Sequence, residues 1–264
     1  MRTRRAASFA SFASFVAIAA LVALGCTTRT PTGVTTSTIV VHAVLNALDD
    51  DQVVVVQRTT AGVPQASPVD SATVTITGPD GVAMAGVEVA DSALTRVYRV
   101  RLLSFQEQLV PGGTYHLRVH LKTGEDVTGT TTIPNAKPSL PSVAIVPFNE
   151  ATDTLRLGWP AVQGAYSYEV RVQSNAGVFA LFTDTSAVLP GTLRSLEGKV
   201  VFADGLDHQV IVSAVDAAYY EYYRTSSDEF TGTTVQGNLS GAQGVFGSLV
   251  VLTVRALHVA ATSP

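Results

Sequence analysis

Residues 71–77 read SATVTIT, and apolar Ala, Val and Ile alternate there with hydroxyl side chains. Successive side chains of a β-strand point to opposite faces, so this period of two predicts a strand with one buried and one solvated face. Pro79, Asp80 and Gly81 follow and favour a tight turn. Residues 71–81 therefore predict a half-buried strand that enters a hairpin.

The same pattern continues on both sides of this strand. Short runs rich in Val, Thr and Tyr are separated by Gly, Pro, Asp and Asn, without an amphipathic helix. We expect further strands over residues 38–45, 52–57, 97–103, 114–121 and 126–133. About six strands in roughly 100 residues indicate an immunoglobulin-like β-sandwich over residues 38–134. Residues 109–115 (LVPGGTY) resemble a tyrosine corner, in which the Tyr115 hydroxyl bonds to nearby backbone.

Three prolines within residues 134–141 predict a break between two domains, because proline cannot donate to a strand ladder. We place a linker at residues 135–142. Beyond it, residues 155–159 (LRLGW) alternate and end on the only Trp, and residues 166–172 (YSYEVRV) form a second strand pattern. These runs resemble strands B and C of fibronectin type III modules.

A later strand of that module has its counterpart in residues 208–216, with His208 where Tyr is usual. The segment between Tyr219 and Val254 is longer than such a module needs, which predicts an insertion before a final strand at residues 248–257. The predicted fold is therefore all-β, with two tandem sandwich domains, the second being fibronectin type III-like over residues 143–264 with an extended C-terminal segment.

Cys26 is the only cysteine, and it follows the pattern of a bacterial lipoprotein signal peptide. Three arginines precede an uncharged, largely apolar stretch at residues 6–24, and Gly25 stands directly before the thiol. This order predicts removal of residues 1–25 and lipidation of Cys26. The alternative is an uncleaved transmembrane anchor, because the stretch approaches the roughly 20 residues that span a bilayer.

Residues 26–37 are rich in Thr and contain little to bury, so we expect a flexible tether. Thr27, beside the cysteine, is not the Asp that retains many bacterial lipoproteins in the inner membrane. This favours a lipid-anchored position in the outer membrane, on its periplasmic or its surface face.

The charge balance narrows the classes of partner. Removal of residues 1–25 takes away three of the 17 basic residues and leaves 14 against 21 acidic ones, a formal charge of −7. Nucleic-acid binding is not expected, because it needs a basic surface. Lipidation of Cys26 would leave no thiol for disulfides, zinc sites or nucleophilic catalysis.

The order of these motifs along the chain resembles a family of uncharacterised bacterial lipoproteins, chiefly from Bacteroidetes. The resemblance comprises the cleavage motif at Cys26, residues 52–59 (QVVVVQRT), residues 72–76, residues 111–119, the strand that ends at Trp159 and a terminal GVFGS at residues 244–248. It implies two β-sandwich lobes on a lipid anchor and an envelope location, often beside outer-membrane receptor systems. It implies no established activity.

The run Tyr219-Tyr220-Glu221-Tyr222-Tyr223 is the strongest candidate binding site. In a strand, Tyr220 and Tyr222 would face one way and Tyr219 and Tyr223 the other, so both faces cannot be core. Exposed tyrosines provide rigid contact area for a protein or a sugar ring. The alternative is that the rings pack on the core and beneath a loop at residues 224–236.

Other candidate residues favour ordinary structural roles. His116 and His120 would lie roughly 13 Å apart on a strand, too far to share a metal ion. Asp49, Asp50 and Asp51 lack the further ligands of a calcium loop. Residues 237–241 (GNLSG) miss the nucleophile elbow of serine hydrolases by one residue, and glycines 241, 244 and 247 favour a bulge or close backbone packing.

Three functions compete on these grounds. The first is a non-enzymatic envelope lipoprotein that binds or positions a protein partner. The second is a glycan-binding accessory lipoprotein, in which the tyrosine run and Asp228 or Glu229 contact the sugar. The third is a hydrolase with a site in the C-terminal insertion. We expect no catalytic residues, no metal and no cofactor.

Overall fold

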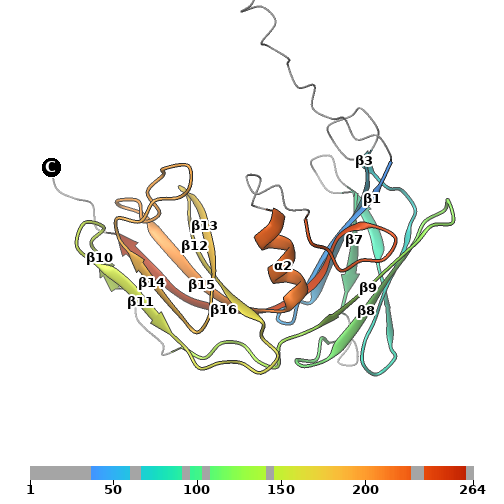
Figure 1. Ribbon diagram of the computed structural model, residues 1–264, viewed down its shortest axis with the longest axis horizontal. Helices are drawn as coiled ribbons and strands as arrows, with labels where there is room; N and C mark the ends of the chain where they lie inside the picture. Colours follow the sequence, from blue (N-terminus) through green and yellow to red (C-terminus); the bar gives the residue numbers. More distant parts are fainter. Residues whose placement is uncertain are drawn as a thin grey trace, which may run out of the picture.

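The computed structural model describes residues 37–59, 67–90, 96–102, 108–140, 146–226 and 235–259. Within them the fold is all-β, as predicted, and it contains one short helix that was not predicted (Figure 1). The strands of the N-terminal half are β1 Ile39–Asn46, β2 Asp51–Arg58, β3 Ser67–Pro68, β4 Thr73–Thr77, β5 Ala83–Ala85, β6 Val87–Ala90, β7 Arg96–Arg101, β8 Thr114–His120 and β9 Asp126–Thr132. The C-terminal half contains β10 Val146–Phe148, β11 Thr154–Gly158, β12 Ser167–Ser174, β13 Gly177–Thr183, β14 Ser186–Pro190, β15 Asp207–Val215, α2 Ala217–Ser226 and β16 Gln243–Val259.

The first lobe is a sandwich built on period-two strands. In β1, Ile39, Val41, Ala43 and Leu45 are buried while the residues between them are half-exposed. One sheet has the order β5-β4-β8-β9, and its apolar face packs against β1, β2 and β7. The hairpin predicted after residues 71–77 is confirmed, because β4 pairs with β5 across that turn.

The second lobe repeats this plan with fewer strands. A two-stranded sheet, β11-β14, packs against β12, β15 and the end of β16 around a second apolar core. The strands predicted at residues 155–159, 166–172 and 208–216 correspond to β11, β12 and β15. Trp159 lies in this core with its ring edge against Tyr168, at a centroid distance of 5.3 Å.

A single sheet runs through both lobes, and β16 joins them. The main path of this sheet is β13-β12-β15-β16-β1-β2-β7-β6. The first residues of β16, from Gln243 to Leu249, pair in parallel with β1, and its later residues pair antiparallel with β15. Ala214 and Val250 are register partners and belong to the second and first core respectively, so both cores lie on the same face of the long sheet.

The opposite face of the long sheet carries α2, which lies at the middle of the molecule (Figure 1). The interpretation of residues 219–223 as a strand is therefore wrong, because these residues lie within the helix Ala217–Ser226. Asp216 caps the helix, since its Oδ1 accepts the N–H of Tyr219 at 2.9 Å. The preference of aromatic residues for strands depends strongly on context. Here the cap at Asp216 and the packing of the tyrosines against the sheet stabilise a helix instead.

Two glycines make the junction possible, as expected for this glycine-rich segment. Gly244 has a φ of +116°, and a Cβ there would lie 1.9 Å from the carbonyl oxygen of Val41. A Cβ on Gly247 would lie 3.0–3.1 Å from the backbone and Cβ of Tyr219. The first glycine permits the pairing of β16 with β1, and the second lets α2 approach the sheet closely.

Candidate functional site

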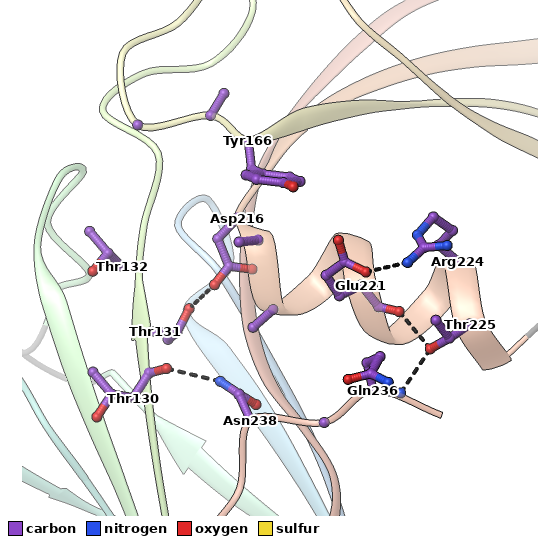
Figure 2. A pocket seen from close by; sticks show the side chains of 15 residues that line it. Thr130, Thr131, Thr132, Tyr166, Asp216, Glu221, Arg224, Thr225, Gln236 and Asn238 are labelled. Atoms are coloured by element: carbon purple, nitrogen blue, oxygen red, sulfur yellow. Dashed lines mark hydrogen bonds and ion pairs between the residues drawn. The ribbon is translucent and has the colours of Figure 1, made fainter. Parts of the chain in front are cut away.

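A pocket of about 800 Å³ lies between the two lobes beside α2. Its walls are the end of β9, residues 164–166 before β12, the exposed side of α2 and residues 236–238 before β16 (Figure 2). Ligand sites commonly have volumes of about 300–1,000 Å³. This interlobe pocket is therefore the candidate functional site.

Asp216 lies at the base of the pocket and forms hydrogen bonds with three of the elements around it. Its Oδ1 accepts the N–H groups of Tyr219 and Ser248, and its Oδ2 accepts the Thr131 hydroxyl at 2.6 Å (Figure 2). These donors belong to α2, β16 and β9, so one carboxylate connects the helix with the first lobe. Burial raises the pKa of Asp216. Because both oxygens are already bonded, the geometry assigns this carboxylate a structural role.

Residues 238–240 close the outer edge of β9. Thr128 and Ser240 exchange backbone hydrogen bonds of 3.0 and 2.8 Å. The Asn238 amide donates to the carbonyls of Thr130 and Phe246, and its Oδ1 accepts the N–H of Phe246. Ser240 thus contributes its backbone to a β-bridge with Thr128.

In the part of the chain that the structure describes, the rim of the pocket carries an ion pair and an exposed ring. Arg224 lies 2.6 Å from Glu221, one helical turn away, and its guanidinium is 5.8 Å from the centroid of the Tyr220 ring. Tyr220 in turn contacts Tyr166, at a centroid distance of 5.3 Å. Tyr166 is 58 % exposed. The sequence pattern placed Tyr166 inside a strand. The turn at Gly164, two residues earlier, was a signal that Tyr166 lies at the beginning of that strand, outside its buried part.

The tyrosine run faces the sheet instead of forming an exposed row. Tyr219 is buried, and its hydroxyl donates to Glu169 at 3.2 Å, where Arg171 also binds. Tyr223 lies with its hydroxyl 2.7 Å from His42 Nε2. Burial raises the pKa of Tyr219, raises that of Tyr223 to about 12 and lowers that of His42.

The other two tyrosines are half-buried. Tyr222 packs edge-on against His42, and Tyr220 contacts Phe182 of β13 at 5.1 Å between ring centroids. The packing of these rings on the sheet agrees with one half of the predicted alternative, in which a pair of rings covers a core. Most of the loop at residues 224–236, beneath which the other pair was expected, lies outside the described residues. A functional role for the run stays a prediction, and only Tyr220 contacts a ring on the rim of the pocket.

Several other predicted residues lie away from the pocket. His116 and His120 are exposed on the outer face of β8, where His120 and Arg118 contact Asp126. Asp49 accepts from the Asn46 amide, and Asp51 pairs with Arg99 at 2.8 Å. No cluster of three or more potential metal ligands occurs among the described residues. Cys26, Asp228 and Glu229 lie outside them.

The fold and the pocket define this protein as a two-lobed all-β sandwich protein with a concave site between its lobes. The chain belongs to the family "Domain of unknown function (DUF4249)", whose family model matches residues 27–255. The predicted resemblance to a family of unknown function is thereby confirmed, while its Bacteroidetes and lipoprotein features stay predictions. No curated protein matches the sequence. No helix in the described part of the chain is long and apolar enough to span a membrane.

Matches to solved structures are distant. Pullulanase complexed with maltotriose from Anoxybacillus sp. LM18-11 gives 7 % identity and a TM-score of 0.24, covering 65 % of this chain and 24 % of that protein. A second pullulanase structure from this source gives 8 % identity and a TM-score of 0.23, with the same coverage. A bacterial ice-binding adhesin gives 13 % identity and a TM-score of 0.22, covering 87 % of this chain and 66 % of that one. Such scores carry no functional argument.

Proposed function

We propose that this chain is a non-enzymatic, lipid-anchored protein of the cell envelope that binds a partner in the interlobe pocket. The pocket itself carries the proposal, because residues of both lobes and α2 build it around a fully bonded carboxylate. The anchor at Cys26 rests on the signal-peptide pattern, and the outer-membrane location rests on Thr27 beside the cysteine.

The polar groups of the pocket support binding over catalysis. A hydrolytic site needs a nucleophile or an acid–base pair that can reach the substrate. Both oxygens of Asp216 accept hydrogen bonds within the fold, and Glu221 is paired with Arg224. The Thr225 hydroxyl donates to backbone carbonyls of its own helix and accepts the N–H of Gln236. These groups hold the walls of the pocket in place.

A pocket-filling substitution tests the proposal. Ala217 lines the pocket with an exposed side chain, so Ala217→Trp should obstruct it without disturbing a core. We expect the full-length protein to retain a defined component from gently solubilised host envelopes and the variant to lose it. If the Ala217→Trp variant retains the same envelope component as wild type, that component does not bind in the interlobe pocket and the proposal is contradicted.

A second candidate, the positioning of a protein partner, has one specific observation in its favour. β13 is an edge strand of the long sheet, and Val178 on it is exposed. Val178 and the fully exposed Leu196 line a groove of about 400 Å³. An extended segment of a partner can pair with such an edge.

The exposed Ala180 of β13 provides the matched control. Ala180→Trp should disturb a partner at this edge and leave the interlobe pocket intact, whereas Ala217→Trp should do the reverse. Loss of the retained component with Ala180→Trp alone would place the partner at β13 and not in the pocket.

A further inference from the structure

We propose that the interlobe pocket takes a neutral saccharide, with a sugar ring stacked on Tyr166 and its hydroxyl groups bonded to Glu221 and Arg224. This inference rests on the proposed function, since it names the chemical class of the ligand in that pocket. It differs from the glycan hypothesis drawn from sequence, because Tyr166 replaces the tyrosine run as the stacking surface.

Tyr166 has the properties of a stacking platform. Its side chain is 58 % exposed and lines the pocket, while its backbone N–H is fixed by a bond to the carbonyl of Val215 at 2.9 Å. The Tyr220 ring supports it at 5.3 Å with an interplanar angle of 50°. A supported tyrosine offers a rigid apolar surface with little conformational entropy to lose, and the C–H face of a sugar packs on such a ring.

The accessible charges of the pocket favour a neutral ligand. The side chains of Glu221 and Arg224 are 35 % and 51 % exposed, and they neutralise each other at 2.6 Å. The third charged residue among the described lining residues, Asp216, is buried and bonded within the fold. An anion would compete with Glu221 for Arg224, and a cation would compete with Arg224 for Glu221. Planar carboxylate and guanidinium groups instead suit adjacent hydroxyls, to which each can make two hydrogen bonds.

The sealed edge of β9 argues against an extended peptide. Peptides commonly bind a sheet by pairing with a free edge strand. The carbonyls of Thr128, Thr130 and Thr132 already accept hydrogen bonds from Ser240, Asn238 and Ser248. A peptide in the pocket would therefore find no backbone ladder on β9 to join.

Binding of the full-length protein to an array of neutral and acidic oligosaccharides, followed by calorimetric titration of the best one, tests this inference. We expect binding of a neutral oligosaccharide whose affinity changes little between 0.05 and 0.5 M salt, because no net charge is recognised. Tyr166→Ala should weaken binding about tenfold or more, because the variant loses the apolar ring surface on which the sugar packs. Tyr166→Phe should retain it, since the ring and not the hydroxyl forms the platform.

Leu196→Ala is the matched control, because Leu196 is exposed and lies away from the pocket. If wild type and Tyr166→Ala have equal thermal unfolding midpoints, a loss of affinity comes from the missing ring and not from a destabilised fold. Three results would overturn the inference: no neutral oligosaccharide binds, acidic ones bind with strong salt dependence, or Tyr166→Ala has no effect. If Ala217→Trp still abolishes retention of an envelope component in those cases, the pocket function stands and only its ligand class is wrong.

Discussion

Each lobe has a turn that is closed by a hydrogen bond from a backbone N–H to a side chain, which we call its lock. The acceptor is a phenol in the first lobe and an imidazole in the second. In the first lobe, the Tyr115 hydroxyl accepts the N–H of Val110, five residues upstream, at 2.6 Å. In the second, Nε2 of His208 accepts the N–H of Ala203, also five residues upstream, at 3.1 Å. His208, which stands where fibronectin type III modules usually have Tyr, thus makes the same kind of bond as Tyr115.

Of these two hydrogen bonds, only the one to His208 is lost when its acceptor takes up a proton in acid. Burial raises the pKa of Tyr115, so its hydroxyl stays neutral at physiological pH. Burial lowers the pKa of His208, and its Nδ1 lies 3.2 Å from the carbonyl of Leu206, which requires the hydrogen on that nitrogen. Nε2 can accept only while the imidazole is neutral. The comparison teaches that equivalent turns can respond differently to acid.

The largest expected effect concerns β16, the strand that the two lobes share. In Gly244→Ala the new Cβ would overlap the carbonyl of Val41, and the backbone has a positive φ. We expect a loss of unfolding free energy on the order of 3–5 kcal/mol. Because β16 also pairs with β15, fluorescence of Trp159 in the second core should report the loss as well.

Gly124→Ala is the matched control for this substitution. Gly124 also has a positive φ, +91°, but nothing lies within 4 Å of its Cβ position. It should cost only about 1–2 kcal/mol from backbone strain. If the unfolding midpoint seen by Trp159 stays unchanged in Gly244→Ala while circular dichroism shows partial unfolding, the lobes fold independently and the coupling through β16 is refuted.

Much of the fold was predictable because strand periodicity is a local signal. The alternation in residues 71–77 and 155–159 sets which side chains are buried, and Tyr115 stands at a recognisable turn. The pairing of β16 with strands of both lobes was not predictable, because Val40 and Gln243 are register partners far apart in sequence. The predicted domain boundary at residues 135–142 stays a prediction.

The site was less predictable than the fold. Consecutive tyrosines suggested a strand with two aromatic faces, but the cap at Asp216 and the small Gly247 beneath Tyr219 favour a helix packed on the sheet. Only the folded structure shows that Tyr166 is the exposed ring and that Thr131 bonds Asp216 across the lobes. Thr131 and Asp216 are 85 positions apart in the sequence, beyond the reach of a local pattern.

A matched pair of substitutions tests the equivalence of the two locks. Tyr115→Phe and His208→Phe each remove the acceptor of one backbone N–H and keep an aromatic ring. At pH 8 we expect each to lower the unfolding free energy by about 1–2 kcal/mol, the cost of leaving a partly buried donor without a partner. Denaturant unfolding measures both, with Tyr166→Phe as a control that should change nothing. A large loss for Tyr115→Phe alone would mean that His208 does not act as a lock.

The smallest expected effect is the pH dependence that separates the locks. An unfolded histidine takes up a proton near its ordinary pKa of about 6.5, whereas His208 in the folded protein does so at lower pH because it is buried. Between these two values the unfolded state binds more protons, so stability is fully present above the ordinary pKa and falls as the pH drops towards the folded one. His42 shifts in the same direction and Asp216 in the opposite one, so wild type alone cannot isolate His208.

The difference in unfolding free energy between wild type and each variant isolates the lock, because the other titrating groups are common to both. From pH 8 to pH 5 the difference for His208→Phe should shrink, because unfolded wild type takes up a proton on this histidine while the folded protein keeps it neutral, and the variant has no histidine there. The difference for Tyr115→Phe should stay constant, since the phenol does not titrate in this range. Parallel pH profiles for the two variants would show that protonation of His208 is not linked to folding and that the two turns are equivalent after all.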